Sequence, residues 1–393
     1  MSDAARRLAG STLAAALRDA RATTLARTLD RSDADWRVPQ QSGVNPIAWE
    51  LGHLAWFAEF WILRGPHILG DDGFVNAARE ATIAGPDAIF DSARLAHPRR
   101  WRVALPTRAE LLERLARQLD ACIAAIPGAG ASDEAALYWH RLALFHEDMH
   151  GEALAWLRAA LSWPAPQGLT LAKWPASAPL ALAGGAFELG RDVDEPGFWF
   201  DNEQPPLPCT VAPFAIDAVP MTNAGFLAFV TAGGYRQPEF WPGDAGRWRA
   251  KSKLAHPQRW RRADDQWQER WFDRWQPLDG DAPVIHVNAW EAEAYCRWAD
   301  RRLPSAAEWQ FAAREPRFRW GRSVWEWTAD PFRPYPGFVA GPYADYSQPW
   351  FGDHRELRGG SFATHERLHS SCYRNFFTPD RCDVFAGFRT AAS

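Results

Sequence analysis

The sequence lacks an excess of positive charge. Its 44 Lys and Arg residues are outnumbered by 48 Asp and Glu residues, and the formal net charge is −4 at pH 7. A nucleic-acid-binding surface needs clustered positive charge, so we expect no nucleic-acid partner. The densest basic stretch, from Arg247 to Arg262, is interleaved with Trp and followed by Asp264 and Asp265. We interpret it as a solvated loop.

The sequence also has few cysteines and no long apolar segment. The five Cys residues are scattered, odd in number and without a CxxC pair, which excludes a disulfide framework and a structural zinc site. The first residues, MSDAARRLAGS, contain no apolar core of a signal peptide. The apolar run from Leu54 to Leu63 is interrupted by Glu59 and is too short to span a bilayer. We expect a cytoplasmic protein without a membrane segment.

The first 162 residues are typical of a helical bundle. Apolar residues recur at helical spacing in four segments, at about 10–30, 44–64, 107–126 and 133–161. Residues 42–46 and 132–134 supply candidate cap residues for the second and fourth segments. Four long helices in succession predict a bundle.

The pattern changes at residues 162–180, which are rich in Pro and aperiodic. Short apolar runs broken by Gly and Pro follow, with helices expected only at about 223–232 and 290–301. At 393 residues the chain is long for one domain. We therefore predict a helical domain at 1–165, a linker at 166–180 and an irregular α+β domain at 181–393.

A candidate metal site lies within the helical domain. His146 and His150 stand four residues apart in the fourth predicted helix, so both imidazoles lie on one helical face. His53, in the second predicted helix, is the best candidate for a third ligand, because adjacent bundle helices can bring such residues together. Three neutral imidazoles leave coordination positions open and suit iron, zinc or copper alike. The motif HEDMH also permits a zinc hydrolase with Glu147 as general base.

Six segments with specific motifs follow the linker: GGAFELG (184–190), PMTNAGFLAFV (220–230), 283–314 with RLPSAAEWQFAAR, SVWEWTADPF (323–332), LRGGSFAT (357–364) and AGFRTA (386–391). In this order they resemble the formylglycine-generating-enzyme (sulfatase-modifying-factor) domain, which has a C-type-lectin-like fold. A catalytic member of that group needs two reactive cysteines near the C-terminus. Here Cys372 lies near that place and Cys382 lies in a different context, so we do not expect that activity; Cys372 and Cys296 are interpreted as buried small residues.

The helical part resembles a DinB-like bundle through GHLAWF and HEDMHGEAL. Fusion of such a bundle to a formylglycine-generating-enzyme-like domain resembles the ergothioneine sulfoxide synthase family, which includes ovothiol and selenoneine synthases. The resemblance spans nearly the whole chain. It implies Fe(II) on His53, His146 and His150, O₂ as co-substrate, and oxidative attachment of sulfur or selenium to an imidazole. The usual acceptor is C2 of hercynine, the trimethylated histidine betaine. The resemblance also implies that Glu147 is not a general base.

Three departures from the ergothioneine pattern bear on the second substrate. Met149 stands where the family commonly has a Gln that orients the histidine betaine. Arg99 matches one of two Arg residues that flank a His-Pro step and bind the carboxylates of γ-glutamylcysteine, whereas Ala96 replaces the other. The family triplet Asn-Trp-Asp, whose Asp contacts the donor's amino group, is here Asn375-Phe376-Phe377. The resemblance implies that the retained Asn375 contacts the acceptor substrate, whereas the Asp is lost.

These losses remove charge that would hold a zwitterionic dipeptide, at roughly 2–5 kcal/mol for each buried contact. Phe377 instead offers an apolar wall that suits a neutral ring such as a selenosugar. We therefore favour selenoneine synthesis over an ergothioneine-type synthase using γ-glutamylcysteine, cysteine or another thiol.

The remaining candidates are aromatic. Trp56, Trp325 and Phe376 offer faces for a trimethylammonium group, although any single Trp is more often a packing residue. The resemblance implies a Tyr that donates a proton or electron, and we predict Tyr343 or Tyr335 for that role. The partners expected are small molecules, and the assembly a monomer or homodimer. A non-catalytic ligand-binding module remains the alternative to an enzyme.

Overall fold

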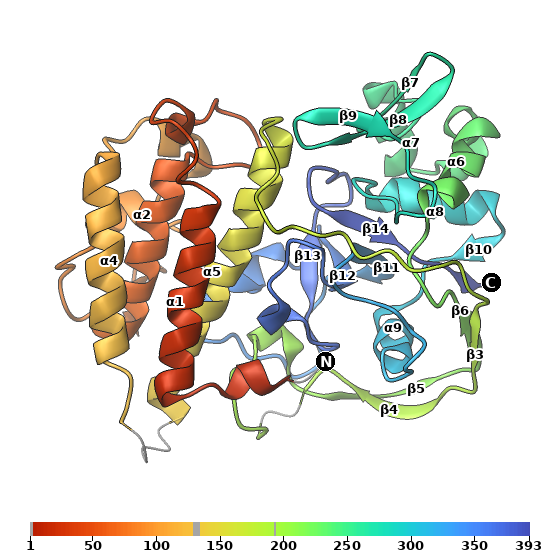
Figure 1. Cartoon of the computed structure of the whole chain (residues 1–393). Coiled ribbons are helices and arrows are strands. Elements are labelled where there is room, and N and C mark those ends of the chain that lie inside the picture. Colours follow the sequence, from red (N-terminus) through yellow and green to blue (C-terminus); the bar gives the residue numbers. More distant parts are fainter. Residues whose placement is uncertain (1–2, 129–133, 192–193) are drawn as a thin grey trace. The chain divides into compact units, whose positions relative to one another are not determined.

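The computed structural model describes residues 3–128, 134–191 and 194–393, and these fall into two compact units (Figure 1). The helical unit comprises residues up to 158 together with 196–198, and the C-terminal unit comprises 159–195 and 199–393. The chain passes between them within the last turn of a long helix, Glu134–Ala160. The finer domain limits at 165 and 181 stay a prediction.

Four long helices form the helical unit, as predicted: α1 (Gly10–Ala26), α2 (Ile47–Ala58), α4 (Arg108–Ala124) and α5 (Glu134–Ala160). They lie side by side in Figure 1. Leu13, Leu17 and Ala20 of α1 follow helical spacing and are buried. They pack with Leu137 and Leu144 of α5 to form the core of the bundle.

The predicted cap of α2 is wrong. α2 begins after Pro46 without a side-chain cap, and the nearby Asn45 side chain donates to Glu50 instead. By contrast, Thr107 and Glu110 form a capping box at the start of α4. Residues 132 and 133, expected to open α5, lie outside the described residues.

The segment after α2 holds the loop that precedes the short helix α3. α2 continues into a π-helical turn at Glu59–Leu63, and the hairpin β1 (His67–Leu69) and β2 (Val75–Ala77) follows. The buried Glu59 carboxylate accepts backbone N–H groups of Thr82, Ile83 and Ala84. This fixes the approach of the short helix α3 (Asp87–Phe90) to α2.

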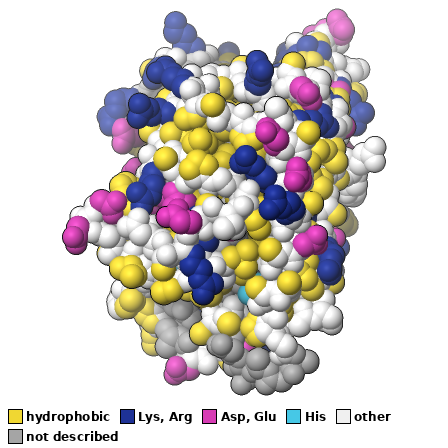
Figure 2. Space-filling model, turned by 90° about the vertical axis from the view of Figure 1, so that its left-hand side faces the viewer, with side chains coloured by type: hydrophobic (Ala, Val, Ile, Leu, Met, Phe, Trp, Pro, Cys, Tyr) yellow, Lys and Arg dark blue, Asp and Glu magenta, His cyan; other side chains and the backbone are white. Residues whose placement is uncertain are grey.

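One face of the helical unit carries both signs of charge. Figure 2 shows basic and acidic side chains interspersed with hydrophobic ones on this face. Two apolar side chains of strand β1, Ile68 and Leu69, are exposed. Among the residues that the structure describes, no helix is both long and apolar enough to cross a bilayer.

The C-terminal unit is built on two four-stranded sheets. In one, the buried strand β11 (Trp325–Pro331) pairs antiparallel with β12 (Arg355–Gly359) and parallel with β14 (Ala386–Phe388), and β12 also pairs with β13 (Asn375–Phe377). The order of the other sheet is β10 (Arg301–Arg302), β15 (Ala391–Ala392), β6 (Phe214–Ile216) and β3 (Leu180–Leu182). Smaller sheets join β4 (Gly185–Leu189) to β5 (Leu207–Val211), and β7 (Trp260–Ala263) through β8 (Gln266–Trp271) to β9 (Arg274–Pro277).

Two of its helices were predicted and two were not. α6 (Asn223–Thr231) and α8 (Ala289–Trp298) match the expected segments. α7 (Asp244–Ser252) and strand β7 correct the interpretation of 247–262 as a loop. α9 (Ala306–Ala312) begins with a Ser305–Glu308 capping box, a readable signal in the sequence. Trp309 of α9 is buried together with Trp325 and Trp327 of β11.

Candidate metal centre

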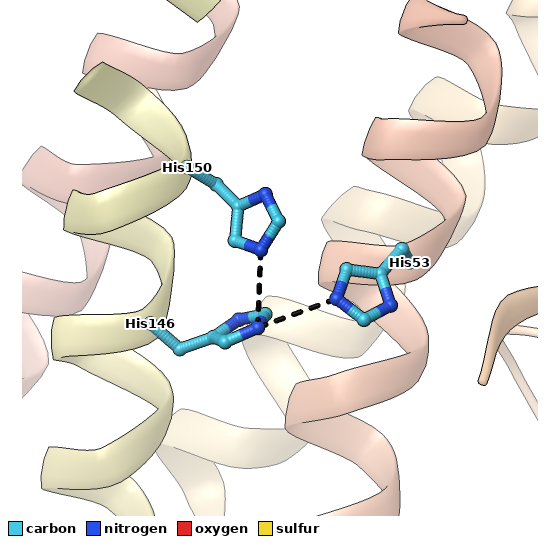
Figure 3. A group of neighbouring side chains, drawn as sticks. All are labelled: His53, His146 and His150. Atoms are coloured by element: carbon cyan, nitrogen blue, oxygen red, sulfur yellow. Dashed lines mark hydrogen bonds between the residues drawn. The ribbon is translucent and has the colours of Figure 1, made fainter. Parts of the chain in front are cut away.

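Three imidazoles meet inside the helical unit. His53 extends from α2, and His146 and His150 extend from successive turns of α5, so that the three rings point toward one another (Figure 3). His146 Nε2 lies 3.3 Å from His53 Nε2 and 3.1 Å from His150 Nε2. His53 and His146 are buried, and His150 is half-buried. The candidate ligand atoms all lie within 4.8 Å of one another, which is the spacing of a metal site.

The hydrogen-bond partners of the Nδ1 atoms fix the tautomers of His53 and His150 when these rings are neutral. His53 Nδ1 lies 2.8 Å from the Phe90 carbonyl oxygen, and His150 Nδ1 lies 2.5 Å from Glu50 Oε1. A carbonyl and a carboxylate only accept, so both Nδ1 atoms donate, and in the neutral rings both Nε2 atoms keep a lone pair. With all three rings neutral, at most one proton, on His146, lies among the three converging Nε2 atoms. A metal cation bound there would satisfy the lone pairs.

Burial keeps the His53 and His146 imidazoles neutral, and the partners of Glu50 keep its carboxylate charged. Burial lowers the pKa of His53 to about 3 and the pKa of His146 well below its usual value. Burial opposes ionisation of Glu50, but the contact with the His150 imidazole, by its hydrogen bond and by its charge when the ring is protonated, outweighs burial and holds the pKa of Glu50 at about 2. Neutral imidazoles with an ionised outer carboxylate are the protonation states that a metal site requires.

One face of α2 binds the segment that orients His53. Trp49 Nε1 donates to the Ile89 carbonyl at 2.7 Å, and Trp56 Nε1 donates to Asp87 at 2.7 Å. Between them stands Gly52, where a Cβ atom would lie only 2.1 Å from the ring of Phe90. A glycine is therefore needed for α3 to approach closely enough that the Phe90 carbonyl reaches His53.

The opposite orienting group, Glu50, has its own support. Asn45 Nδ2 donates to Glu50 Oε2 at 2.8 Å, and Arg100 Nη1 donates to Asn45 Oδ1 at 2.7 Å. The Arg100 guanidinium also lies 3.9 Å from the ring centroid of Trp49, which stacks on His53 at 4.9 Å. His146 stacks on Phe57 at 3.5 Å between ring centroids. Each imidazole is therefore held by contacts from outside the centre.

The surroundings of Glu147 do not fit the role of a general base. It is buried and forms an ion pair with Arg21 of α1 at 2.7 Å, and Arg21 also donates to Gln118 of α4. Its carboxylate therefore joins α5 to the two neighbouring helices. This arrangement removes the basis of the zinc-hydrolase interpretation, which needs Glu147 beside an activated water.

The helical and C-terminal parts each match a family model. Residues 16–154 match the DinB superfamily, and residues 170–324 and 321–393 match the sulfatase-modifying factor enzyme 1-like domain. The hercynine oxygenase of Mycobacterium tuberculosis is 33% identical over 96% of this chain and 98% of its own length. The hercynine oxygenase of Mycolicibacterium thermoresistibile is 32% identical over 96% of this chain and 94% of its own length. This chain belongs to the hercynine oxygenase family.

The C-terminal part by itself is also similar to a different enzyme. The formylglycine-generating enzyme of Streptomyces coelicolor is 28% identical over 53% of this chain and 87% of its own length. All five cysteines here are free thiols, and Cys296 and Cys372 are buried as predicted. Burial raises the pKa of Cys382 to about 12, so its thiolate is not available near neutral pH.

The predicted substrate residues of the helical unit differ in their surroundings. The Trp56 ring lies 5.8 Å from the His53 ring and is buried. Met149 is half-buried on α5, and Arg99 is exposed in the short helix His97–Trp101. Arg100, the next residue, is the one that contacts the surroundings of the imidazoles. Roles of Trp56, Met149 and Arg99 in substrate binding stay predictions.

The predicted substrate residues of the C-terminal unit lie on β13 and β11. Asn375 Oδ1 accepts the backbone N–H of Phe376, and the Phe376 ring stacks on Phe332 at 4.1 Å. Phe377 is not a bare apolar wall, because the Arg381 guanidinium lies 5.0 Å from its ring centroid. Trp325 is 1% exposed and packs in the core of the unit.

The two candidate tyrosines are unlike each other. Tyr335 belongs to an apolar core cluster, accepts a hydrogen bond from Arg358 at 3.1 Å and lies beneath Arg374. Burial raises its pKa. Tyr343 is half-buried and its ring lies 6.3 Å from Tyr346. Its exposure makes Tyr343 the more accessible of the two.

The sequence analysis missed the groups that orient the imidazoles. Glu50 stands three residues before His53 and shares its helical face, so its spacing was a readable signal. No sequence signal indicated the contact of the Phe90 carbonyl with His53 or that of Arg100 with Asn45. The first pair lies 37 residues apart in the chain and the second 55, and loops bring them together.

Proposed function

We propose that this protein is a non-haem iron enzyme that uses O₂ to join a selenosugar to C2 of the imidazole ring of hercynine. The coarser part of this proposal, an oxidoreductase acting on hercynine, is supported by two relatives that bear the name hercynine oxygenase and align with nearly the whole chain. Iron, the three histidine ligands and the selenium donor are the finer part.

The observation that carries the metal centre is the convergence of the three Nε2 atoms, with His146 Nε2 at 3.3 Å from His53 Nε2 and at 3.1 Å from His150 Nε2. His53, His146 and His150 would hold Fe(II) and leave the remaining coordination positions open. A set of three neutral ligands leaves the 2+ charge of the ion uncompensated, which favours binding of an anionic selenolate or thiolate. The same set fits other divalent ions, and the choice of iron rests on the family.

The chemistry needs an oxidant because C2 of an imidazole does not react with ordinary nucleophiles. When bound, Fe(II) supplies the one-electron steps by which O₂ reacts with closed-shell molecules. The C2–H bond and the donor's chalcogen–H bond break, a carbon–chalcogen bond forms, and both hydrogens leave in water. Retention of the second oxygen atom on the chalcogen accounts for all four oxidising equivalents of O₂. The aromatic face of Trp56 suits the trimethylammonium group of hercynine.

The donor proposal rests on lost charges. Ala96 and Phe377 stand where the γ-glutamylcysteine pattern has an Arg and an Asp, and Arg99 is exposed. The Arg381 guanidinium over Phe377 is a cation and offers no contact to a donor amino group, and the Asp383 carboxylate beside it is already engaged with Arg381 at 2.6 Å. An uncharged sugar with a selenol places the least demand on these positions.

The decisive experiment is an anaerobic reconstitution with Fe(II) and hercynine, followed by addition of O₂ with either a selenosugar or γ-glutamylcysteine. Mass spectrometry of the products should show a selenium adduct of hercynine from the selenosugar reaction. Product only from γ-glutamylcysteine would assign the enzyme to ergothioneine-type synthesis and leave the metal proposal intact. No product and no O₂ consumption with either donor or with cysteine would contradict both and favour a binding module.

The tyrosine proposal is tested in the same assay. We propose Tyr343, rather than the core residue Tyr335, as the proton or electron donor. Tyr343→Phe should change product ratio or rate, whereas Tyr335→Phe should chiefly lower the melting temperature because it removes the acceptor of Arg358. Unchanged products and rates in both variants would exclude either tyrosine from the reaction.

A further inference from the structure

Arg100 lies where two lines of contact to the metal-binding histidines meet. It stands in the short helix His97–Trp101, far along the chain from α5. Neither its position nor its spacing in the sequence predicts that Arg100 lies near the three histidines. Its guanidinium nevertheless contacts both an amide and an aromatic ring that belong to the surroundings of the centre.

The first line of contact runs to His150 through hydrogen bonds. Arg100 Nη1 donates to Asn45 Oδ1 at 2.7 Å, and the amide nitrogen of Asn45 then donates to Glu50 Oε2 at 2.8 Å. The other carboxylate oxygen, Glu50 Oε1, accepts from His150 Nδ1 at 2.5 Å. Because Arg100 holds the amide oxygen, the amide nitrogen of Asn45 is the atom that faces Glu50.

The second line runs to His53 through stacked planar groups. The Arg100 guanidinium lies 3.9 Å from the Trp49 ring centroid, and the Trp49 ring is stacked on the His53 imidazole at 4.9 Å and 9°. Trp49 is itself held by the Ile89 carbonyl, one residue before the carbonyl that binds His53. The position of the guanidinium therefore limits the tilt of the His53 ring.

We propose that Arg100 is a positioning residue for the metal centre, which fixes the orientations of His53 and His150 together through Trp49 and through Asn45 and Glu50. This inference rests on the proposed function only in requiring that the three histidines bind a metal ion. A planar guanidinium can stack on an indole while it donates in its own plane, and a lysine ammonium cannot do both. Arginine is therefore the residue type that this position needs.

The test measures metal affinity without turnover. Co(II) is titrated into metal-free full-length protein under anaerobic conditions, and its visible d–d absorption reports binding and coordination geometry. Arg100→Ala should raise the Kd for Co(II) about tenfold, the lower end of the effect of outer partners of metal ligands. Loss of a positive charge by itself strengthens cation binding, so a weaker affinity cannot arise from charge.

Arg37→Ala is the matched control, because Arg37 and Arg100 line the same cavity of about 540 Å³ and Arg37 is exposed. We expect its Kd to stay within twofold of the wild type. Asn45→Ala should also weaken binding, and the Arg100→Ala/Asn45→Ala pair should weaken it by less than the product of the single effects, because both lie on one line of contact.

Two results would overturn the inference. One is a lower melting temperature of metal-free Arg100→Ala with unchanged Co(II) affinity and spectrum, which describes a merely structural arginine. The other is an equal effect of Arg37→Ala. If the alanine variant does not fold, Arg100→Lys retains the charge and should still weaken Co(II) binding, and wild-type affinity in that variant would contradict the inference. Absence of Co(II) binding to the wild type would overturn the proposed metal centre itself.

Discussion

Glu50 in the helical unit and Glu356 in the C-terminal unit are both 2% exposed, yet their surroundings differ in kind. Glu356 accepts hydrogen bonds from Arg358 and Arg374, at 2.6 Å and 2.7 Å. Although burial opposes it, these two charges hold the pKa of Glu356 below its usual value. The arginines also donate to backbone carbonyls, so every strong donor of the group is engaged within the fold.

Glu50 instead binds one neutral amide and one imidazole, and the other ring nitrogen of that imidazole points away from the carboxylate toward His146 Nε2. The partners of Glu356 are engaged within the fold, whereas the contact of Glu50 leads to the group of three imidazoles. A buried charge therefore indicates a functional site when its partners lead to a cluster of candidate metal ligands. Four predictions test this difference.

The largest expected effect is loss of metal. His53→Ala, His146→Ala and His150→Ala should each abolish stoichiometric iron binding and turnover, because two imidazoles cannot retain the ion against solvent. Metal analysis of purified protein and O₂ consumption provide the measurements, with circular dichroism to verify folding. Full iron content in any one variant would remove that histidine from the ligand set.

Next is the stability of the group around Glu356. Glu356→Gln leaves Arg358 and Arg374 buried without a counter-charge, which should lower the free energy of unfolding by about 3–5 kcal/mol. Chemical denaturation of the variant and the wild type gives the difference. A loss below about 1 kcal/mol would mean that the two arginines find other partners, and the contrast with Glu50 would weaken.

The matching change in the helical unit should affect metal rather than stability. Glu50→Gln keeps the shape and an acceptor for His150 Nδ1 but removes the charge, so we expect metal affinity to fall about 10–100-fold. Chelator competition measures the affinity, and denaturation measures the stability of the metal-free form. A stability loss as large as that of Glu356→Gln, with unchanged metal affinity, would contradict our distinction between the two carboxylates.

The smallest effect is a dependence on pH in the metal-free protein. Burial lowers the pKa of His53 to about 3, whereas an unfolded histidine has a pKa near 6.5. Between these values the unfolded chain binds more protons, so the free energy of unfolding falls as the pH falls from 6.5 toward 3. Glu356, with a pKa below the usual carboxylate value, contributes no slope between pH 5 and 7.

Denaturation at pH 7 and pH 5.5 measures this slope. His53→Asn should reduce the slope relative to the wild type, because its side chain does not titrate, and Glu356→Gln should leave it unchanged. An identical slope in His53→Asn and the wild type would mean that His53 gains a proton in the folded protein.

The sequence by itself determined the bundle, the three candidate metal ligands and the family resemblance. Apolar spacing indicated four helices, and the i, i+4 relation of His146 and His150 placed both rings on one face regardless of tertiary detail. The motifs of the C-terminal part indicated its fold in the same local way. α7 was missed because its nine residues, Asp244–Ser252, bury only Ala245 and so carry little amphipathic signal.

Only the tertiary structure decided the orientations of the three imidazoles and the partners of their ring nitrogens. Those depend on a backbone carbonyl at Phe90, on the close approach allowed by Gly52, and on the contacts of Arg100. A carbonyl oxygen has the same chemistry at every residue, so no sequence pattern reports which one reaches a ring nitrogen. The role of Glu147 was also decided by the tertiary structure. The HEDMH motif permitted it to be a general base, but the packing of α1 against α5 places it in an ion pair with Arg21.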